Sequence, residues 1–429
     1  MGMDGELEDK RIQARFVTKL GPPLKVTSNS IAIPSNLTRL GLSAIVNSLL
    51  KAGGAEGENQ PFDFIIDGEL VRMPLDQFLL AKGISAERII EIEYFKAVAP
   101  RKEEQPSIHD DWVSAVDGSC PTFVVSGCYD KLARIWYRDG ECSHILAGHN
   151  DAITSVSVVN REVMDGIKIA TASKDRTIRL WKVDSTVKEN HLAKINAFKI
   201  LRGHSAAVQS VSPQPSGDMI CSGSWDCTIN LWKVDEPFSI PTKKRKGKGQ
   251  CEEMLSEGEA VSTLVGHTQQ VSAVYWSGQN DIYSSSWDYS LRKWDVEKGV
   301  DTSKVLCVKA LNCLHVGGEG SSLVAVGSSD PILRVWDLRR PGTSGPVNQF
   351  SSHGSWISAC KWHSKSWFHL LSASYDGKVM LWDLRTAWPI CVIKSHEAKV
   401  LCADWWKGDS VISGGADNKL CISGEIPVQ

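Results

Sequence analysis

Residues 222–232 read SGSWDCTINLW, and residues 372–382 read SASYDGKVMLW. In both stretches small or hydroxylated residues precede an aspartate, and a tryptophan follows that aspartate six positions later. Apolar and polar residues alternate in between, which predicts a strand, a tight turn that carries the aspartate, and a second strand. The aspartate recurs seven times at intervals of 41 to 62 residues: Asp130, Asp175, Asp226, Asp288, Asp330, Asp376 and Asp417.

A histidine keeps step with the aspartate and precedes it by about 20 to 30 residues, at His149, His204, His267, His353 and His396. A branched aliphatic residue follows each histidine four positions later. His109 supplies the first copy, and Cys307 stands at the corresponding place in the fifth. A serine or threonine lies four residues before each aspartate except the fifth, where the residue is Val326. Together these spacings resemble the WD40 repeat, a four-stranded propeller blade.

In the WD40 family the histidine, the hydroxyl, the aspartate and the tryptophan form one buried hydrogen-bonded network. The resemblance therefore implies an all-β, seven-bladed WD40 β-propeller over residues 109–429, with an incomplete network in the fifth repeat. Tryptophan closes the first six repeats and Ser423 stands in the seventh. Too few residues follow Ser423 for another strand, and proteins avoid open sheet edges. We expect residues 99–108, otherwise a polar linker, to close the ring.

Residues 11–98 do not repeat and predict a separate small domain, after a disordered N-terminus at 1–10. Alternating strands are expected at 11–19, 24–34, 62–72 (a hairpin) and 88–95, with one helix from about Thr38 and a second at 74–83. This order resembles the α+β ubiquitin-like β-grasp. FDFIIDGEL and GISAERIIEIEY support a narrower resemblance, to the ubiquitin-like domain that precedes propellers in Notchless and its relatives.

Composition excludes several function classes. The net charge is −2, with 48 basic and 50 acidic residues, so no global field favours nucleic acid or an anionic membrane. The chain has no apolar run near 18 residues and no secretory signal. Its 12 cysteines form no CxxC pair, which disfavours zinc and disulfides. No P-loop, GxSxG or HExxH motif occurs. We expect no enzyme, no cofactor and no metal site of the protein's own.

The connection at about 235–260 is rich in charge, Gly and Pro, which predicts disorder. Within it KKRKGK resembles a nuclear localisation signal. The residues concerned are Lys243, Lys244, Arg245, Lys246 and Lys248. The plainer interpretation is a solvated loop with incidental lysines. A second connection, after Trp181, is also long, and both should leave the propeller on the face opposite the histidines.

The residue before the turn aspartate is aromatic in four repeats: Tyr129, Trp225, Trp287 and Tyr375. Aromatic side chains on an exposed rim favour a protein partner, because they dominate interface hot spots. The alternative is that they pack on loops of neighbouring blades. WDLR, at 336–339 and 382–385, resembles the WDxR signature of substrate receptors for cullin-based ubiquitin ligases, although Trp-Asp already belongs to the repeat.

With a ubiquitin-like domain followed by seven blades, the chain resembles the WD-repeat subunit of Pescadillo–Bop complexes, which act in large-subunit (60S) ribosome biogenesis and rRNA maturation. This resemblance implies a scaffold of the nucleolus and nucleoplasm that binds the Bop protein, Pescadillo and pre-60S particles. It further implies that Glu87 completes the Mg²⁺ shell of the adhesion site in Midasin, an AAA ATPase; on residue chemistry alone Glu87 is a helix-end charge. Sequence-specific nucleic-acid binding is not expected. Notchless, which normally carries an additional blade, and a ubiquitin-ligase receptor remain the alternatives.

Overall fold

The computed structural model describes residues 11–27, 29–53, 60–71, 73–85, 88–97, 102–137, 141–160, 166–183, 193–234, 256–339, 345–386, 389–424 and 426. The chain forms two compact units, one made almost entirely of the residues up to Ala99 and the other of residues from Pro100 onward, and the two are described separately. We call the first the head and the second the propeller. The expected disordered N-terminus at 1–10 lies outside the described residues.

The head is a five-stranded sheet with two helices. Its elements are β1 (Arg11–Val17), β2 (Ser30–Pro34), α1 (Arg39–Ala52), β3 (Phe62–Ile66), β4 (Glu69–Leu70), α2 (Leu75–Lys82) and β5 (Ile90–Lys96). The sheet order is β2-β1-β5-β3-β4, and only the central pair β1 and β5 is parallel. This order confirms the predicted α+β head. Thr38 occupies the N-cap of α1 as predicted, but its side chain forms no capping hydrogen bond.

The core of the head lies between the sheet and α1. Leu42, Val46 and Leu50 on α1 are buried and lie four residues apart, so they form an apolar stripe on one face of the helix. They join a cluster that includes the rings of Phe16 and Phe64, whose centroids are 6.2 Å apart at an edge-to-face angle. Burial of this stripe ties the helix to the sheet.

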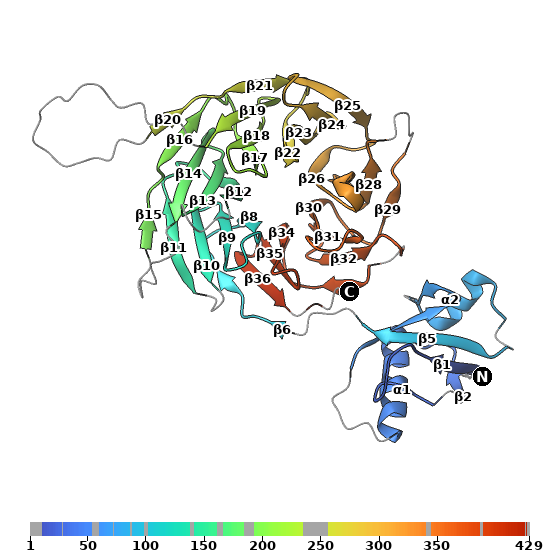
Figure 1. Ribbon diagram of the computed structural model, residues 1–429. Helices are drawn as coiled ribbons and strands as arrows, with labels where there is room; N and C mark the ends of the chain where they lie inside the picture. Colours follow the sequence, from blue (N-terminus) through green and yellow to red (C-terminus); the bar gives the residue numbers. More distant parts are fainter. Residues whose placement is uncertain are drawn as a thin grey trace, which may run out of the picture. The chain divides into compact units, whose positions relative to one another are not determined.

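Seven sheets arranged around a ring form the propeller (Figure 1). The innermost strands are β8 (Val113–Asp117), β12 (Ile153–Asn160), β17 (Val208–Pro213), β22 (Val271–Ser277), β26 (Leu311–Gly317), β30 (Ile357–Trp362) and β34 (Val400–Trp406). The second strands are β9 (Phe123–Cys128), β13 (Ile167–Ser173), β18 (Met219–Ser224), β23 (Asp281–Ser286), β27 (Leu323–Ser328), β31 (His369–Ser374) and β35 (Ser410–Gly415). A 3₁₀ turn, η2 (Glu319–Ser321), joins β26 to β27.

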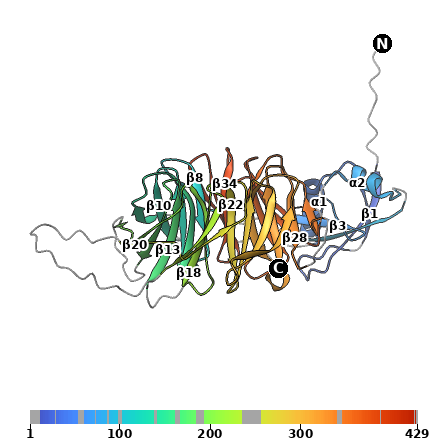
Figure 2. The ribbon, with the colours of Figure 1, turned by 90° about the horizontal axis from the view of Figure 1, so that it is seen from above.

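The third strands are β10 (Leu132–Tyr137), β14 (Thr177–Val183), β19 (Thr228–Lys233), β24 (Ser290–Asp295), β28 (Leu333–Asp337), β32 (Val379–Asp383) and β36 (Lys419–Gly424). The fourth strands of blades 1 to 6 are β11 (Cys142–Ala147), β16 (Lys199–Arg202), β21 (Ser262–Val265), β25 (Val300–Leu306), β29 (Asn348–Phe350) and β33 (Cys391–Ile393). Seen edge-on, the blades stand side by side (Figure 2). The seven-bladed fold predicted from the aspartate count is confirmed.

The seventh blade takes its outer pairing from the segment before His109. The short strands β6 (Lys102–Glu103) and β7 (Ser107–Ile108) both pair antiparallel with β36. Glu103 lies opposite Ser423, and Ser107 lies opposite Leu420. The blade therefore joins the start of the propeller to its last strand, and the edge of β36 is paired.

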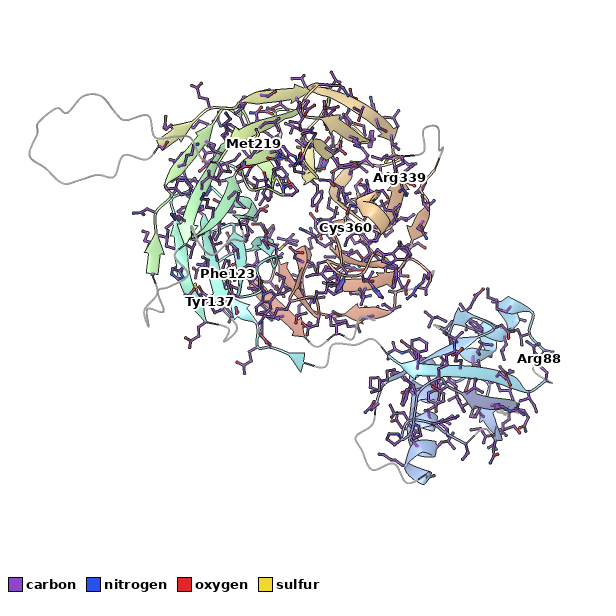
Figure 3. All side chains as sticks on the ribbon, in the orientation of Figure 1. Arg88, Phe123, Tyr137, Met219, Arg339 and Cys360 are labelled. Carbon is purple, nitrogen blue, oxygen red and sulfur yellow. The ribbon has the colours of Figure 1, made fainter. Side chains whose placement is uncertain are left out.

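Small residues in the second strands make room for the next blade. A Cβ atom added to Gly223 would lie 2.6 Å from Cγ1 of Val271, which begins the innermost strand of the following blade. Gly127 and Ile153 stand in the same relation, as do Gly414 and Val113 across the ring closure. In these blades the glycine three residues before the turn aspartate therefore packs against the branched residue that begins the innermost strand of the next blade. Side chains fill the space between the ribbons, with Cys360 toward the ring centre (Figure 3).

Each of the two long connections contains one further strand. β15 (Ala193–Ile195) pairs parallel with β11 of blade 1, and β20 (Ser256–Gly258) pairs parallel with β16 of blade 2. Each connection therefore ends as a fifth strand on the outer edge of the preceding blade. The expected disorder at 235–260 is wrong for residues 256–260, because backbone pairing to an open edge satisfies polar groups that a charge-rich composition does not reveal. Residues 235–255 lie outside the described residues.

Cys221 in β18 and Cys402 in β34 are free thiols, and both are buried. They pack as small apolar side chains in the cores of their blades. Neither helix of the described chain is long and apolar enough to cross a membrane.

Candidate functional site

A buried network ties each histidine loop to its blade. In blade 3, Nδ1 of His204 lies 2.9 Å from Oδ2 of Asp226, and Nε2 lies 2.8 Å from Oγ of Ser222. The indole nitrogen of Trp232 donates to the same oxygen at 2.8 Å. Burial alone would raise the pKa of Asp226, but hydrogen bonds from His204 and Thr228 hold it well below its ordinary value. Thus the carboxylate stays charged and the loop stays fixed.

Blades 2, 4 and 6 repeat this arrangement around His149 with Asp175, His267 with Asp288, and His353 with Asp376. In blade 7, His396 contacts Asp417 and Ser413, each at 2.9 Å, without a tryptophan. We call the face that carries these loops and turns the histidine face. The predicted structural pairs of these five blades are therefore all formed.

Blade 1 differs from the prediction, and blade 5, which was expected to lack the histidine, holds its turn aspartate in the same way. Asp130 forms an ion pair with Arg134 at 2.6 Å instead of contacting His109, and Asp330 pairs with Arg334 at 2.8 Å. His109 still contacts Oγ of Ser126 at 2.9 Å, and burial lowers its pKa to about 4. An arginine four residues after the aspartate is the available signal. It is ambiguous, because blades 2 and 4 carry such an arginine and keep their histidine pairs.

In blade 5 the network is incomplete, as predicted. Val326 replaces the hydroxyl, and the buried Nε1 of Trp336 has no hydrogen-bond partner. Pro331 follows the turn aspartate there, whereas the matching residue has a positive φ in the other six turns, for example 69° at Cys227. Because the proline ring fixes φ near −65°, this turn cannot have the same backbone.

The four rim aromatics come together around one cavity of about 180 Å³: Tyr129, Trp225, Trp287 and Tyr375 all line it. They divide into two kinds. Tyr129 stacks on Trp112 with ring centroids 5.7 Å apart, and Tyr375 stacks on Trp356 at 6.1 Å. Trp225 and Trp287 instead keep 48% and 39% of their surface exposed. The two tyrosines are thus packed, but on the histidine loops of their own blades and not on those of neighbouring blades, whereas the two tryptophans are more exposed.

Trp112 and Trp356 were missed by the sequence analysis. Both lie three residues after the repeat histidine, His109 and His353, which is the signal that could have found them. They are each 43% exposed on the histidine face. Trp112 also lines a second hollow of about 480 Å³ with Tyr375, Glu397 and Lys399. Exposed aromatic surface therefore continues from the ring axis toward blades 6, 7 and 1.

Two predicted sites lie outside the described residues: Glu87 and the basic stretch 243–248. Next to Glu87, the guanidinium of Arg88 forms an exposed ion pair with Asp67 at 3.0 Å. Arg88 therefore contacts a carboxylate from the β3–β4 turn of its own domain.

The arginines of both WDLR stretches bind the aspartate of their own motif. Arg339 contacts Asp337 at 2.9 Å, and Arg385 contacts Asp383 at 2.6 Å. Both aspartates are buried, while the arginine side chains are 63% exposed. The guanidinium of Arg385 also lies 4.0 Å from the ring centroid of Phe368. Each arginine is therefore held by its own blade.

Family models match both parts of the chain. The NLE (NUC135) domain matches residues 12–79, and the WD domain, G-beta repeat, matches 105–137, 140–182, 196–233, 258–295 and 344–383. These ranges omit most of blades 5 and 7, which lack members of the repeat network.

Three relatives named "Ribosome biogenesis protein WDR12 homolog" align along nearly the whole chain. The Arabidopsis thaliana protein is 63% identical, and the alignment covers 100% of both chains. The protein of Oryza sativa subsp. japonica is 60% identical with 98% of each chain covered. That of Chlamydomonas reinhardtii is 36% identical over 96% of this chain and 97% of its own. The chain therefore belongs to the family of WDR12 ribosome biogenesis proteins.

Proposed function

We propose that this protein is a non-enzymatic scaffold in the biogenesis of the large (60S) ribosomal subunit and in rRNA maturation, in the nucleolus and nucleoplasm. The observation that carries the proposal is the end-to-end match to relatives named for ribosome biogenesis. The architecture supports it, since the head is followed by a propeller of seven blades. Notchless normally carries one blade more. A propeller with exposed aromatic side chains and loops held by hydrogen bonds is suited to binding other proteins.

In this proposal the propeller binds the Bop protein through its histidine face. Trp225 and Trp287 supply large exposed rings near the ring axis, and Trp112 and Trp356 extend the surface outward. Aromatic residues of this kind supply much of the binding energy of protein interfaces. The networks beneath them fix the loops in advance, which lowers the entropy lost on binding.

The head is proposed to engage the adhesion site of Midasin through Glu87. Mg²⁺ is bound by oxygen ligands and retains several waters, so it accepts one carboxylate from outside. Force from the ATPase on the head would then remove the protein and its partners from pre-60S particles. The metal ion in this contact belongs to Midasin.

Affinity purification of the tagged full-length chain tests the proposal. We expect Bop, Pescadillo, Midasin and pre-60S particles among the recovered proteins. The double variant Trp225→Ala with Trp287→Ala should lose Bop, whereas Trp367→Ala should retain it. Trp367 is 53% exposed but follows an innermost strand, at the face opposite the histidines. Recovery of a cullin adaptor in place of the ribosomal factors would contradict the proposal and favour the ubiquitin-ligase alternative.

A further inference from the structure

The loop between β30 and β31 carries an exposed indole on the face opposite the histidines. Trp367 is 53% exposed, more than any other tryptophan that the structure describes. Its ring centroid lies 5.2 Å from that of Phe368, at an edge-to-face angle. An exposed aromatic ring of this size is a surface on which another flat group can stack.

The loop is held in place by its two histidines. Nδ1 of His363 accepts hydrogen bonds from the backbone N–H groups of Lys365 and Ser366, at 3.1 and 2.9 Å. Its Nε2 therefore carries the hydrogen and donates to the carbonyl oxygen of Gly408 in the next blade, at 2.7 Å. Nδ1 of His369 lies 2.7 Å from Oγ of Ser366. The loop is thus ordered before any partner binds, which lowers the entropy lost on binding.

Two lysines lie beside this loop. The side chain of Lys365 reaches the turn of blade 7, where a Cβ atom added to Gly408 would lie 3.6 Å from its Cε and 3.7 Å from its Nζ. In the same turn the ammonium of Lys407 lies 3.7 Å from the ring centroid of Trp406. Both lysines therefore belong to the connections between the innermost and second strands of blades 6 and 7.

Arg385 adds a guanidinium that lies above a buried carboxylate. Its Nε and Nη2 donate to Asp383, at 2.9 and 2.6 Å, and its guanidinium lies 4.0 Å from the ring centroid of Phe368. Asp383 is 6% exposed, whereas the side chain of Arg385 is 63% exposed. One exposed carboxylate, Asp409, follows in the turn of Lys407 and only partly offsets the two lysines. The near-balanced charge of the whole chain therefore conceals a local surface of N–H donors.

We propose that Lys365, Trp367, Arg385 and Lys407, which we call the loop patch, bind single-stranded RNA without sequence preference. Ammonium and guanidinium groups attract phosphates, and an unpaired base stacks on an exposed indole. Phosphate oxygens only accept hydrogen bonds, which suits the donors of Arg385. An acidic peptide would satisfy the cations but leave the indole unused. RNA binding goes beyond the proposed scaffold role and does not depend on it, because the loop patch lies on the other face from the proposed Bop surface.

Binding of fluorescein-labelled decauridylate to the full-length chain tests this inference. Every chain used carries alanine at the basic positions of 243–248, so that this second basic stretch does not contribute. Fluorescence anisotropy should show binding that weakens between about 50 and 200 mM salt. Trp367→Leu should weaken binding by about fivefold to 150-fold, the range of one base–aromatic stack. Trp367→Tyr keeps an aromatic ring and should retain most of the affinity.

The contribution of Lys365 is tested by its charge and by its position. Lys365→Glu should weaken binding and reduce the slope of log affinity against log salt by at least about 0.7, the share of one phosphate contact in a single strand. Trp367→Leu should leave this slope unchanged, because stacking releases no counterion. Lys304→Glu, on the exposed outer strand β25 of blade 4, makes the same change in net charge and should alter neither affinity nor slope.

Urea unfolding followed by tryptophan fluorescence establishes that each variant folds. Absence of decauridylate binding, or equal effects of Lys365→Glu and Lys304→Glu, would overturn the inference, since binding would then be missing or follow net charge alone. Polyglutamate that binds as tightly as decauridylate, and is lost with Lys365→Glu, would also overturn it and assign the loop patch to an acidic protein. Recovery of Bop by the Trp367→Leu chain reports on the histidine face, so failure of RNA binding and failure of the scaffold role are distinguishable.

Discussion

The strongest stability prediction concerns the hydroxyl at the centre of a blade network. Ser284 in blade 4 contacts Nε2 of His267 and Nε1 of Trp294, each at 2.7 Å, and all three residues are buried. Because Asp288 can only accept, His267 donates to it through Nδ1, so its Nε2 accepts from Ser284. Ser284→Val therefore leaves one acceptor and one donor unpaired in the interior.

Each unpaired buried group costs about 1–3 kcal/mol, so the substitution should lower the unfolding free energy by about 2–6 kcal/mol. The matched variant is Val326→Thr in blade 5. There the buried Nε1 of Trp336 has no partner, and a threonine hydroxyl could accept from it as Thr171 accepts from Trp181 at 2.9 Å. Desolvation of the new hydroxyl offsets this gain, so the expected change stays within about 1 kcal/mol.

Urea unfolding followed by tryptophan fluorescence measures both variants in the full-length protein. All 16 tryptophans lie after residue 109, so the signal reports the propeller and not the head. Ser262→Val, at an exposed position on β21, is the control and should change the unfolding free energy by no more than about 0.5 kcal/mol. If Ser284→Val behaves like this control, the network does not stabilise the blade and the reasoning is refuted.

Four further predictions follow from the same structure. Gly223→Val should destabilise the propeller by about 1–3 kcal/mol in urea unfolding, since its Cβ would meet Val271 at 2.6 Å, while Gly345→Ala, with nothing within 4 Å, should not. The unfolding free energy should fall as the pH drops from about 6.5 to about 4, because burial lowers the pKa values of His109 and His369 to about 4 and the unfolded chain binds those protons; replacing both by Asn should flatten this region of the pH curve. Glu87→Ala and Glu87→Asp should weaken magnesium-dependent pull-down by the Midasin adhesion domain without loss of Bop, and an effect equal to wild type with or without chelator would contradict the metal contact. Alanine at the basic positions of 243–248 should reduce nuclear import, scored by microscopy, with unfolding unchanged; a full nuclear signal would mean entry by another route.

Local spacing was sufficient to predict the fold because each blade is specified by contacts between residues close in the chain. The histidine, the hydroxyl and the turn aspartate of blade 3 all lie between 204 and 226, so their order along the sequence reports their network in space. The gap at Val326 likewise predicted the missing partner of Trp336. The effect of a replacement within one blade network can therefore be predicted from the sequence.

It fails where two local solutions compete or where a segment joins a distant edge. Arg134 and His109 are both placed to hold Asp130, and only the packed geometry decides in favour of the arginine. The pairing of β20 with β16 depends on an open edge about 55 residues earlier in the chain, to which the composition of 235–260 gives no clue.

The candidate binding surface shows the same division. Counting back one residue from each aspartate was enough to assign four aromatics to the rim. Their convergence on one cavity could not be predicted in this way, because it depends on the closing of the ring. Closure brings the seven innermost strands together, so that residues between 114 and 401 line a single site. Whether an aromatic ring is covered then depends on one neighbouring position. Trp112 and Trp356 stand three residues after their histidines and stack on Tyr129 and Tyr375, whereas blade 3 has Ala207 and leaves Trp225 open.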